Sequence, residues 1–269
     1  MQSLSFRVAC LILLTAIALE AQWSDRVYPI RELTDEMRAR IDLRDGSVED
    51  WPEVLGQPAL TALDFATHPS YPEYDPSSFD FRVWLAWHDA GNHLFVAAEI
   101  VDDIYVGMWP DNPPDWAPAD RPPFWQPAEG TVQLLVDGDR SGGTVVETGM
   151  EQAQAYWAVA ENHENGSNVF LSLVGLDYPW VQQVPYADGS GSVLDSQPVF
   201  YAVEFYVTPF DRLIPDSPEN SLVSDLYAGK TIFFPLGFTY TPRSLSSVPL
   251  YHFSPPPPPP GGGGGGVGV

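Results

Sequence analysis

The sequence predicts an all-β fold of short strands joined by long loops. Among 269 residues, 28 are proline, 22 are glycine and 13% are aromatic. Proline and glycine mark turns, whereas aromatic residues favour half-buried strands. Stretches with helical polar periodicity are few, so short strands and loops are favoured over helices. The hydrophobic content of 44% suffices for a sizeable core, and the length suits one large domain or two small ones.

The clearest strands flank a tight turn. In residues 82–87, the side chains of Arg82, Trp84 and Ala86 alternate with those of Val83, Leu85 and Trp87. An alternation with a period of two residues is typical of a strand. Residues 90–92, Ala-Gly-Asn, form a turn signal, and residues 94–100 form the return strand. Pro235 interrupts the last strand and predicts a bulge or an edge position. Further strands are predicted over 131–136, 155–159, 169–174, 199–207 and 231–239, and a short helix over 34–43 with Thr34 as its cap.

A segment rich in tryptophan and proline spans residues 105–127. It holds Trp109, Trp116, Trp125 and seven prolines. Proline lacks the N–H that a central strand needs, so the segment is predicted to be a long structured loop. Long loops inside compact domains are usually functional or disordered, and the aromatic content argues against disorder.

The charge restricts the possible partners. The formal net charge is −24, from 12 basic and 36 acidic residues. Nucleic acids and anionic membranes are bound through Lys and Arg, so neither is expected as a partner. Neutral sugars or cations fit this balance better, although solubility alone would also explain it.

The N-terminus has the pattern of a signal peptide over residues 1–21. Arg7 precedes the apolar run 8–17, and cleavage after Ala18 or Ala21 is expected. The run is shorter than the roughly 20 residues of a membrane-spanning helix; a buried helix or an uncleaved anchor is the alternative. The sequence therefore predicts a secreted or periplasmic protein that has no membrane attachment once the signal peptide is cleaved. The only cysteine, Cys10, lies in this segment, so the mature chain has no disulfide and no cysteine metal site.

Three further regions follow the signal peptide. Residues 22–40 form an N-terminal lead segment and residues 41–253 the folded domain. Residues 254–269 form a tail with six prolines and then six glycines, a composition that gives polyproline and flexible coil instead of a core.

Several segments in order resemble the family 9 carbohydrate-binding modules, a group within the DOMON-like β-sandwiches. The resemblance spans residues 41 to about 253. Its motifs are the Asp-Gly and Asp-Trp pairs of 45–51, FRVWLAW with LFVAAEIVDD (81–87 and 94–103), EGTVQLLVD (129–137), VFYAVEFYVTP (199–209) and LGF (236–238).

The resemblance implies an antiparallel, jelly-roll-like β-sandwich that binds poly- or oligosaccharide without cleaving it. Such modules are often appended to glycoside hydrolases and hold sugars between tryptophans, with calcium in support. It implies Trp125 as the main stacking residue and Gln133 where the family usually has Glu. Trp109, Trp116 and Trp180 are further candidates, and all these aromatics could instead pack loops onto the sandwich.

The chain departs from the family at two points. It has no tryptophan after Trp180, and residues 154–158 read Gln-Ala-Tyr-Trp-Ala where the family has a polar Arg and Asn. The fold is therefore expected to carry over better than the sugar preference.

The protein partner that the resemblance implies is a glycoside hydrolase or a cell-surface component.

Calcium is a separate hypothesis. Asp137, Asp139 and Ser141 place oxygen ligands two residues apart in a glycine-rich turn, which suits a hard cation. Asp102 and Asp103, at the end of a predicted strand, are a second candidate. A solvated turn is the alternative.

Two other functions stay open. Common motifs of hydrolases, metalloproteases and nucleotide-binding enzymes are missing from the sequence, which argues against an enzyme. A haem-binding DOMON-like domain would use Met108 with a histidine, without covalent attachment. His88 and His93 show a loose metal-like spacing, but a turn explains it equally well. A structural or interaction surface module without a sugar ligand is the third possibility.

Overall fold

The computed structural model describes residues 27–64, 66–67, 75–103, 131–142, 152–160, 167–172, 181–194, 196, 198–215, 217–238, 253–254 and 267–268. The predicted signal peptide and the predicted loop of 105–127 lie outside these residues, as does most of the Pro/Gly tail. No helix in the described part of the chain has both the length and the apolar character needed to span a membrane.

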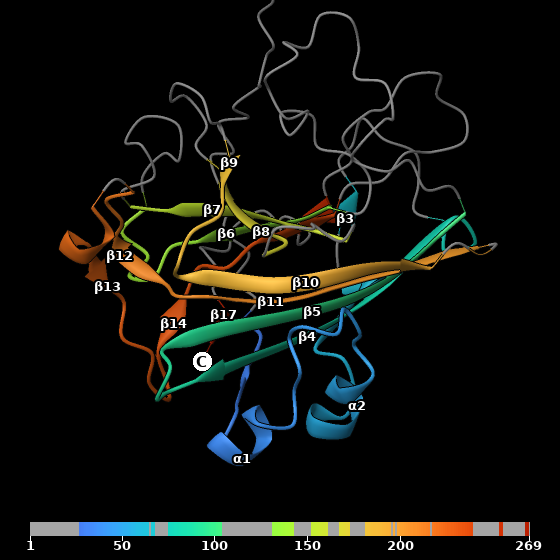
Figure 1. The fold of residues 1–269 in the computed structure, drawn as a ribbon, viewed down its shortest axis with the longest axis horizontal. Coiled ribbons are helices and arrows are strands. Elements are labelled where there is room, and N and C mark those ends of the chain that lie inside the picture. Colours follow the sequence, from blue (N-terminus) through green and yellow to red (C-terminus); the bar gives the residue numbers. More distant parts are fainter. Residues whose placement is uncertain are drawn as a thin grey trace, which may run out of the picture.

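Two sheets form the body of the molecule (Figure 1). The first has the order β1-β4-β5-β11-β10, with β2 also paired to β4, and the second has the order β15-β6-β7-β8-β9. All pairings in the two sheets are antiparallel except that of β1 with β4. The strands of the first sheet are β1 (Arg31–Glu32), β2 (Leu60–Thr61), β4 (Phe79–His88), β5 (His93–Asp102), β10 (Ala187–Leu194) and β11 (Val199–Val207). Those of the second are β6 (Thr131–Val136), β7 (Gln154–Val159), β8 (Val169–Ser172), β9 (Val181–Gln182) and β15 (Leu236–Phe238).

Short elements complete the described structure. Three small two-stranded sheets pair β3 (Ala66–Thr67) with β16 (Phe253–Ser254), β12 (Phe210–Arg212) with β13 (Leu222–Val223), and β14 (Thr231–Ile232) with β17 (Val267–Gly268). The helices are α1 (Asp35–Arg38) and α2 (Asp50–Leu55), and the 3-10 turns are η1 (Ala62–Asp64) and η2 (Pro218–Asn220).

The main core lies between the two sheets. Successive strand residues point to opposite faces, so each strand sends every second side chain inward. Val83 and Leu85 of β4 and Val203 and Phe205 of β11 meet residues of the second sheet such as Tyr156, all in one cluster. The stacked rings of Phe81 and Phe238, with centroids 4.0 Å apart, connect the sheets directly. The fold is therefore an all-β antiparallel sandwich, as the sequence predicts.

A second core covers the outer face of the first sheet. Residues 33–55 cross this face with α1 and α2 (Figure 1) and bury Leu33, Trp51 and Val54 against Trp84 and Phe95. The first sheet is consequently buried on both faces, which explains why β4 and β5 are apolar almost throughout. Trp51, Trp84 and Trp87 are all nearly inaccessible and belong to the two cores.

Local signals located five of the six described strands that have six or more residues, namely β4, β5, β6, β7 and β11. The helix predicted over 34–43 is shorter than expected, because α1 ends at Arg38. Strands β6 and β11 match their predicted ranges, and the Thr34 hydroxyl accepts a hydrogen bond from Met37 N at 3.2 Å, as expected of a helix cap. Pro235 separates β14 from β15, and β15 is an edge strand. Strand β10 was not predicted, because its sequence ADGSGSVL lacks apolar alternation.

The glycines of β10 have a steric role. A Cβ on Gly189 would lie 2.2 Å from Glu204 O, and one on Gly191 would lie 2.5 Å from Val159 O. Strand β10 therefore approaches its neighbours more closely than side chains would allow.

Candidate functional site

The structure describes only some of the residues predicted to bind a ligand. Gln133, Asp102, Asp103, Asp137, Asp139 and Ser141 lie in the described part, whereas Trp109, Trp116, Trp125, Trp180 and Met108 lie outside it. The predicted tryptophan site is thus represented by Gln133 alone.

Gln133 lies on the outer face of the second sheet. Its neighbours in β6, Val132 and Leu134, point into the main core, so Gln133 points away from it. Directly opposite on β7 stands Trp157, and the same row continues to Phe170 on β8. On the other side, β15 contributes Gly237, which adds no side chain beside the amide. Gln133 and Trp157 are both half-buried.

We name this pair, Gln133 and Trp157, the outer-face pair. Residues directly opposite on antiparallel strands have Cβ atoms about 5 Å apart, so an indole and an amide adjoin on one surface. The sequence analysis assigned no role to Trp157. Its signal was the alternation with Tyr156 and Ala158, both buried in the core, which puts Trp157 on the outer face.

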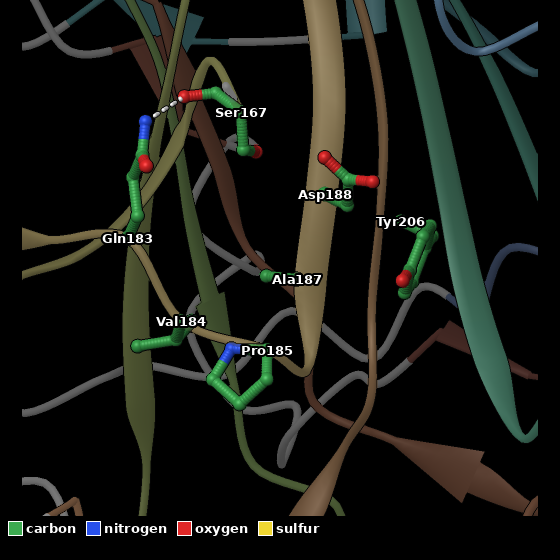
Figure 2. A pocket seen from close by; sticks show the side chains of 7 residues that line it. All are labelled: Ser167, Gln183, Val184, Pro185, Ala187, Asp188 and Tyr206. Atoms are coloured by element: carbon green, nitrogen blue, oxygen red, sulfur yellow. Dashed lines mark hydrogen bonds between the residues drawn. The ribbon is translucent and has the colours of Figure 1, made fainter. Parts of the chain in front are cut away.

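A groove opens around the start of β10 (Figure 2). Its volume is about 280 Å³. The lining residues come from segments before β8, after β9, in β10 and in β11; they are Ser167, Gln183, Val184, Pro185, Ala187, Asp188 and Tyr206. Figure 2 shows Gln183 and Ser167 on one side of β10, Tyr206 on the other side, and Asp188 on the strand itself.

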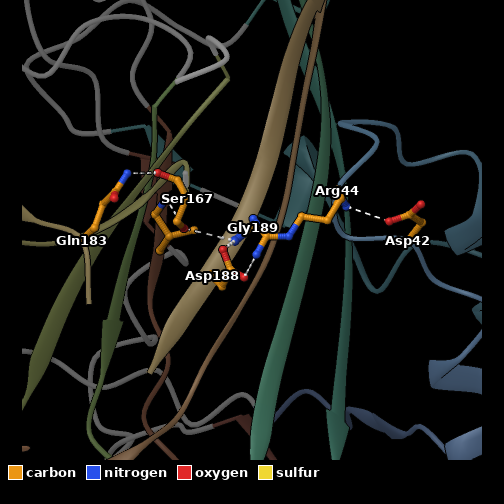
Figure 3. A network of polar contacts seen from close by, with 7 residues as sticks. Asp42, Arg44, Ser167, Gln183, Asp188 and Gly189 are labelled. Carbon is orange, nitrogen blue, oxygen red and sulfur yellow. Dashed lines mark hydrogen bonds and ion pairs between the residues drawn. The ribbon is translucent and has the colours of Figure 1, made fainter. Parts of the chain in front are cut away.

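Polar contacts hold the walls of this groove (Figure 3). Ser167 Oγ accepts hydrogen bonds from Val169 N at 3.1 Å and Gly189 N at 3.2 Å. Its carbonyl oxygen accepts one from Gln183 Nε2 at 2.7 Å. The Asp188 carboxylate forms an ion pair with Arg44. Through Arg44 on one side of β10 and Ser167 on the other, these contacts connect the N-terminal segment to the residues that precede β8 of the second sheet.

Tyr206 is fixed in the same region. Its ring stacks on that of His93, with centroids 4.0 Å apart and an angle of 25° between the planes. Burial, assisted by the negative charge of Asp188, raises the pKa of the Tyr206 hydroxyl above its ordinary value. The hydroxyl therefore keeps its proton over the physiological range and can donate a hydrogen bond.

The predicted calcium turn is held by its own backbone. Asp137 Oδ2 accepts a hydrogen bond from Gly142 N, and Asp139 Oδ1 accepts one from Ser141 N, both at 2.9 Å. Burial raises the pKa of Asp137 to about 6. The Oδ1 atom of Asp137 is buried and has no hydrogen-bond partner among the described residues. This oxygen could therefore serve as one ligand of a cation.

The second pair of predicted calcium ligands, Asp102 and Asp103, lies at the end of β5 and not in the turn of Asp137. Asp102 ends β5 and is fully buried, and Asp103 follows it. Within the described ranges, no three His, Cys, Asp or Glu side chains gather as a metal site would require. Calcium prefers six to eight oxygens, so the described side chains would have to be supplemented by carbonyls or water.

The chain is similar in structure to a family 9 carbohydrate-binding module. That module, from Caldicellulosiruptor kristjanssonii in complex with glucose, aligns with a TM-score of 0.44 and 11% identity over 86% of this chain and 85% of its own. A "putative carbohydrate-binding protein" from Bacteroides uniformis aligns with a TM-score of 0.44 and 13% identity over 87% of this chain and 92% of its own. No protein-family description matches the sequence, and no curated protein matches it.

The two histidines with metal-like spacing close the β4–β5 turn. They are paired opposite one another, and the turn between them includes Asn92 with a φ of 50°. His88 Nε2 contacts Asp35 Oδ1 at 2.9 Å, and its Nδ1 accepts a hydrogen bond from Gly91 N. Both ring nitrogens of His88 are therefore engaged, and burial lowers the pKa of His93 to about 4. The position of His88 and His93 at this turn therefore explains their spacing in the sequence.

Proposed function

We propose that this chain is a non-catalytic carbohydrate-binding module that holds a neutral poly- or oligosaccharide on the outer face of its second sheet. The observation that carries the proposal is the outer-face pair, in which Gln133 and Trp157 stand opposite each other on β6 and β7.

The chemistry of this pair suits a sugar ring. A pyranose has an apolar C–H face that stacks on an indole, and its hydroxyl groups need fixed polar partners. Trp157 supplies the indole, and the Gln133 amide supplies one donor group and one acceptor beside it. Strand pairing on both sides of β6 fixes the position of Gln133. The platform is thus formed before the ligand arrives, which reduces the entropy lost on binding.

The overall charge agrees with a neutral ligand. At −24, the chain repels anionic polymers, while an uncharged polysaccharide pays no such cost. The signal-peptide pattern supports action outside the cytoplasm, in the secreted or periplasmic space where polysaccharides are degraded. In this proposal the module targets a glycoside hydrolase, or a cell-surface component, to polysaccharide, and bond cleavage belongs to that partner.

The test is retention on polysaccharide. Native electrophoresis through gels containing soluble glucans, xylan or mannan, and pull-down with cellulose, should show retention of the full chain. Trp157→Ala should weaken retention at least tenfold, because stacking area is lost, and Gln133→Ala should weaken it less. Phe200→Ala is the matched control: it truncates a partly exposed aromatic on the outer face of the other sheet.

Two outcomes would reject the proposal. Passage of the wild-type chain through every polysaccharide without delay would favour a surface module without a sugar ligand. Equal losses for Trp157→Ala and Phe200→Ala would show that the outer-face pair has no special part. Trp125→Ala, measured in the same gels, tests the stacking residue predicted from the sequence.

A further inference from the structure

The groove around the start of β10 has features of a built site, separate from the outer-face pair. Its polar walls come from distant parts of the chain. Ser167 precedes β8, Gln183 follows β9 and Asp188 lies in β10, yet hydrogen bonds connect them through Gly189 (Figure 3). Groups held in this way lose little freedom when a ligand binds.

The charge of the groove narrows the class of ligand. Among the lining residues that the structure describes, Asp188 is the one with a charged side chain, and Arg44 neutralises it. An anionic ligand would be repelled by the Asp188 carboxylate, and the described lining residues include no basic side chain that could attract it. A divalent cation would find a single carboxylate that is already paired, well short of the oxygens it needs. The groove therefore suits an uncharged ligand.

The hydrogen-bonding groups point to a hydroxylated ligand. Gln183 uses its Nε2 to hold Ser167 O, and its Oε1 has no hydrogen-bond partner in the described part of the chain. The Asp188 carboxylate accepts from Gly189 N at 2.9 Å and from Arg44, which leaves further lone pairs for donors. The Tyr206 hydroxyl can both donate and accept. Hydroxyl groups satisfy all three, because each can donate and accept.

The apolar surface completes the match. Val184 and Pro185 form one side of the groove, and the Tyr206 ring is held rigidly by its stacking on His93. A volume of 280 Å³ lies just below the usual range of ligand sites, roughly 300 to 1,000 Å³. This volume is sufficient for one or two sugar units.

We infer that this groove is a second saccharide site, which binds one or two neutral sugar units through Gln183, Asp188 and Tyr206. The inference extends the proposed function and rests on it for the class of ligand. The two sites differ in shape: the outer-face pair is a platform for a polymer, whereas the groove is a short recess. A chain end or a branch of a polysaccharide is the part that a short recess can receive.

The experiment is an NMR titration of the full isotope-labelled chain with cello-, xylo- and manno-oligosaccharides of two to six units. The backbone amide of Gly189 and the side-chain amide of Gln183 report the groove, and the Trp157 indole N–H reports the outer-face pair. With a matching disaccharide, the groove signals should shift. Asp188→Asn should weaken this binding about tenfold, since a charge-assisted hydrogen bond to the ligand is lost.

A closely matched control exists on the same sheet. Arg82 and Glu99 form an ion pair with side-chain exposures of 55% and 27%, against 60% and 25% for Arg44 and Asp188. Glu99→Gln removes the acidic partner of an equally exposed pair outside the groove, and disaccharide binding should not change. Gln183→Ala, on an exposed side chain, provides a second groove variant if Asp188→Asn unfolds.

The outcomes separate the two proposals. Shifts of the Trp157 indole without shifts at Gly189 and Gln183 would overturn the groove while supporting the proposed function. Shifts in the groove alone would support the groove and reject the outer-face pair. Equal weakening by Asp188→Asn and Glu99→Gln would also overturn the groove. No shift with any of these saccharides would reject both.

Discussion

The indole N–H of Trp51 donates a hydrogen bond of 3.0 Å to Oε2 of Glu204, two residues 153 positions apart in the sequence. Trp51 belongs to α2, and Glu204 points from β11 into the second core. The other carboxyl oxygen accepts a bond from Ser190 Oγ at 3.3 Å. This contact attaches the N-terminal segment to the first sheet through a fully buried carboxyl group.

Glu204 should make stability depend on pH. Burial, together with the nearby charges of Asp45 and Asp50, raises the pKa of Glu204 to about 8, against an ordinary value of 4.5. Below pH 4.5 the group is protonated in both the folded and the unfolded chain. Between pH 4.5 and 8 the unfolded chain releases this proton and the folded chain keeps it, so stability falls as pH rises. The full loss is on the order of 5 kcal/mol and is complete above pH 8.

The measurement is the free energy of unfolding of the wild type and of Glu204→Gln between pH 7 and pH 9. The wild type should lose about 1 kcal/mol across this window, and the variant should stay level because its amide does not ionise. Asp137 is already ionised and His93 already neutral over this range, given their pKa values of about 6 and 4. Parallel curves for the two proteins would contradict the assignment.

The ring stacking of Phe81 and Phe238 should contribute to the attachment of the two sheets. Both residues are almost fully buried, and Phe238 belongs to β15 at the edge of the second sheet. Phe238→Ala removes a large buried ring and should lower the free energy of unfolding by about 3 to 5 kcal/mol. Tyr227→Ala, at a ring that is 59% exposed, should change it by less than about 1 kcal/mol. Denaturant unfolding of the two variants compares them; similar losses would show that the Phe81–Phe238 contact is not important.

Gly191 should be required for close packing and not for its backbone conformation. A Cβ there would lie 2.5 Å from Val159 O and 2.7 Å from Ala160 Cα, both backbone atoms. Gly191→Ala should therefore cost about 1 to 3 kcal/mol of stability, because a backbone must shift. Gly142 offers the converse case, with open space but a φ of +75°, so Gly142→Ala should cost about 1 kcal/mol from strain alone. Thermal unfolding tests the order, and a larger loss at Gly142 would contradict it.

Calcium binding is tested at the turn of Asp137 and Asp139. The orphan Oδ1 of Asp137 is the feature that favours an ion there. If the turn binds calcium, titration of chelator-stripped protein should release heat at millimolar Ca²⁺, and Asp137→Asn should abolish it. Asp35→Asn, at an exposed carboxylate on α1, should leave the heat unchanged. Absence of heat from the wild type would reject the site.

The sequence by itself determined the strands whose side chains alternate. In β6 and β11 the burial of alternate residues follows the order of apolar and polar side chains, because successive residues of a strand point to opposite faces. The cap at Thr34 and the break at Pro235 are also local, since each depends on a single backbone hydrogen bond.

Only the tertiary structure decided which residues become neighbours. Strand β10 forms although its sequence has little strand character, because its glycines fit against β11 and the far sheet. Trp157 reaches Gln133 through strand pairing, and Arg44 reaches Asp188 across 144 residues. Such contacts depend on register and on the packing of whole sheets, which residue order does not encode locally. The outer-face pair and the groove both arise at this level. The alternation therefore predicted the strands, and the family resemblance implied the sandwich, but neither predicted these two surfaces.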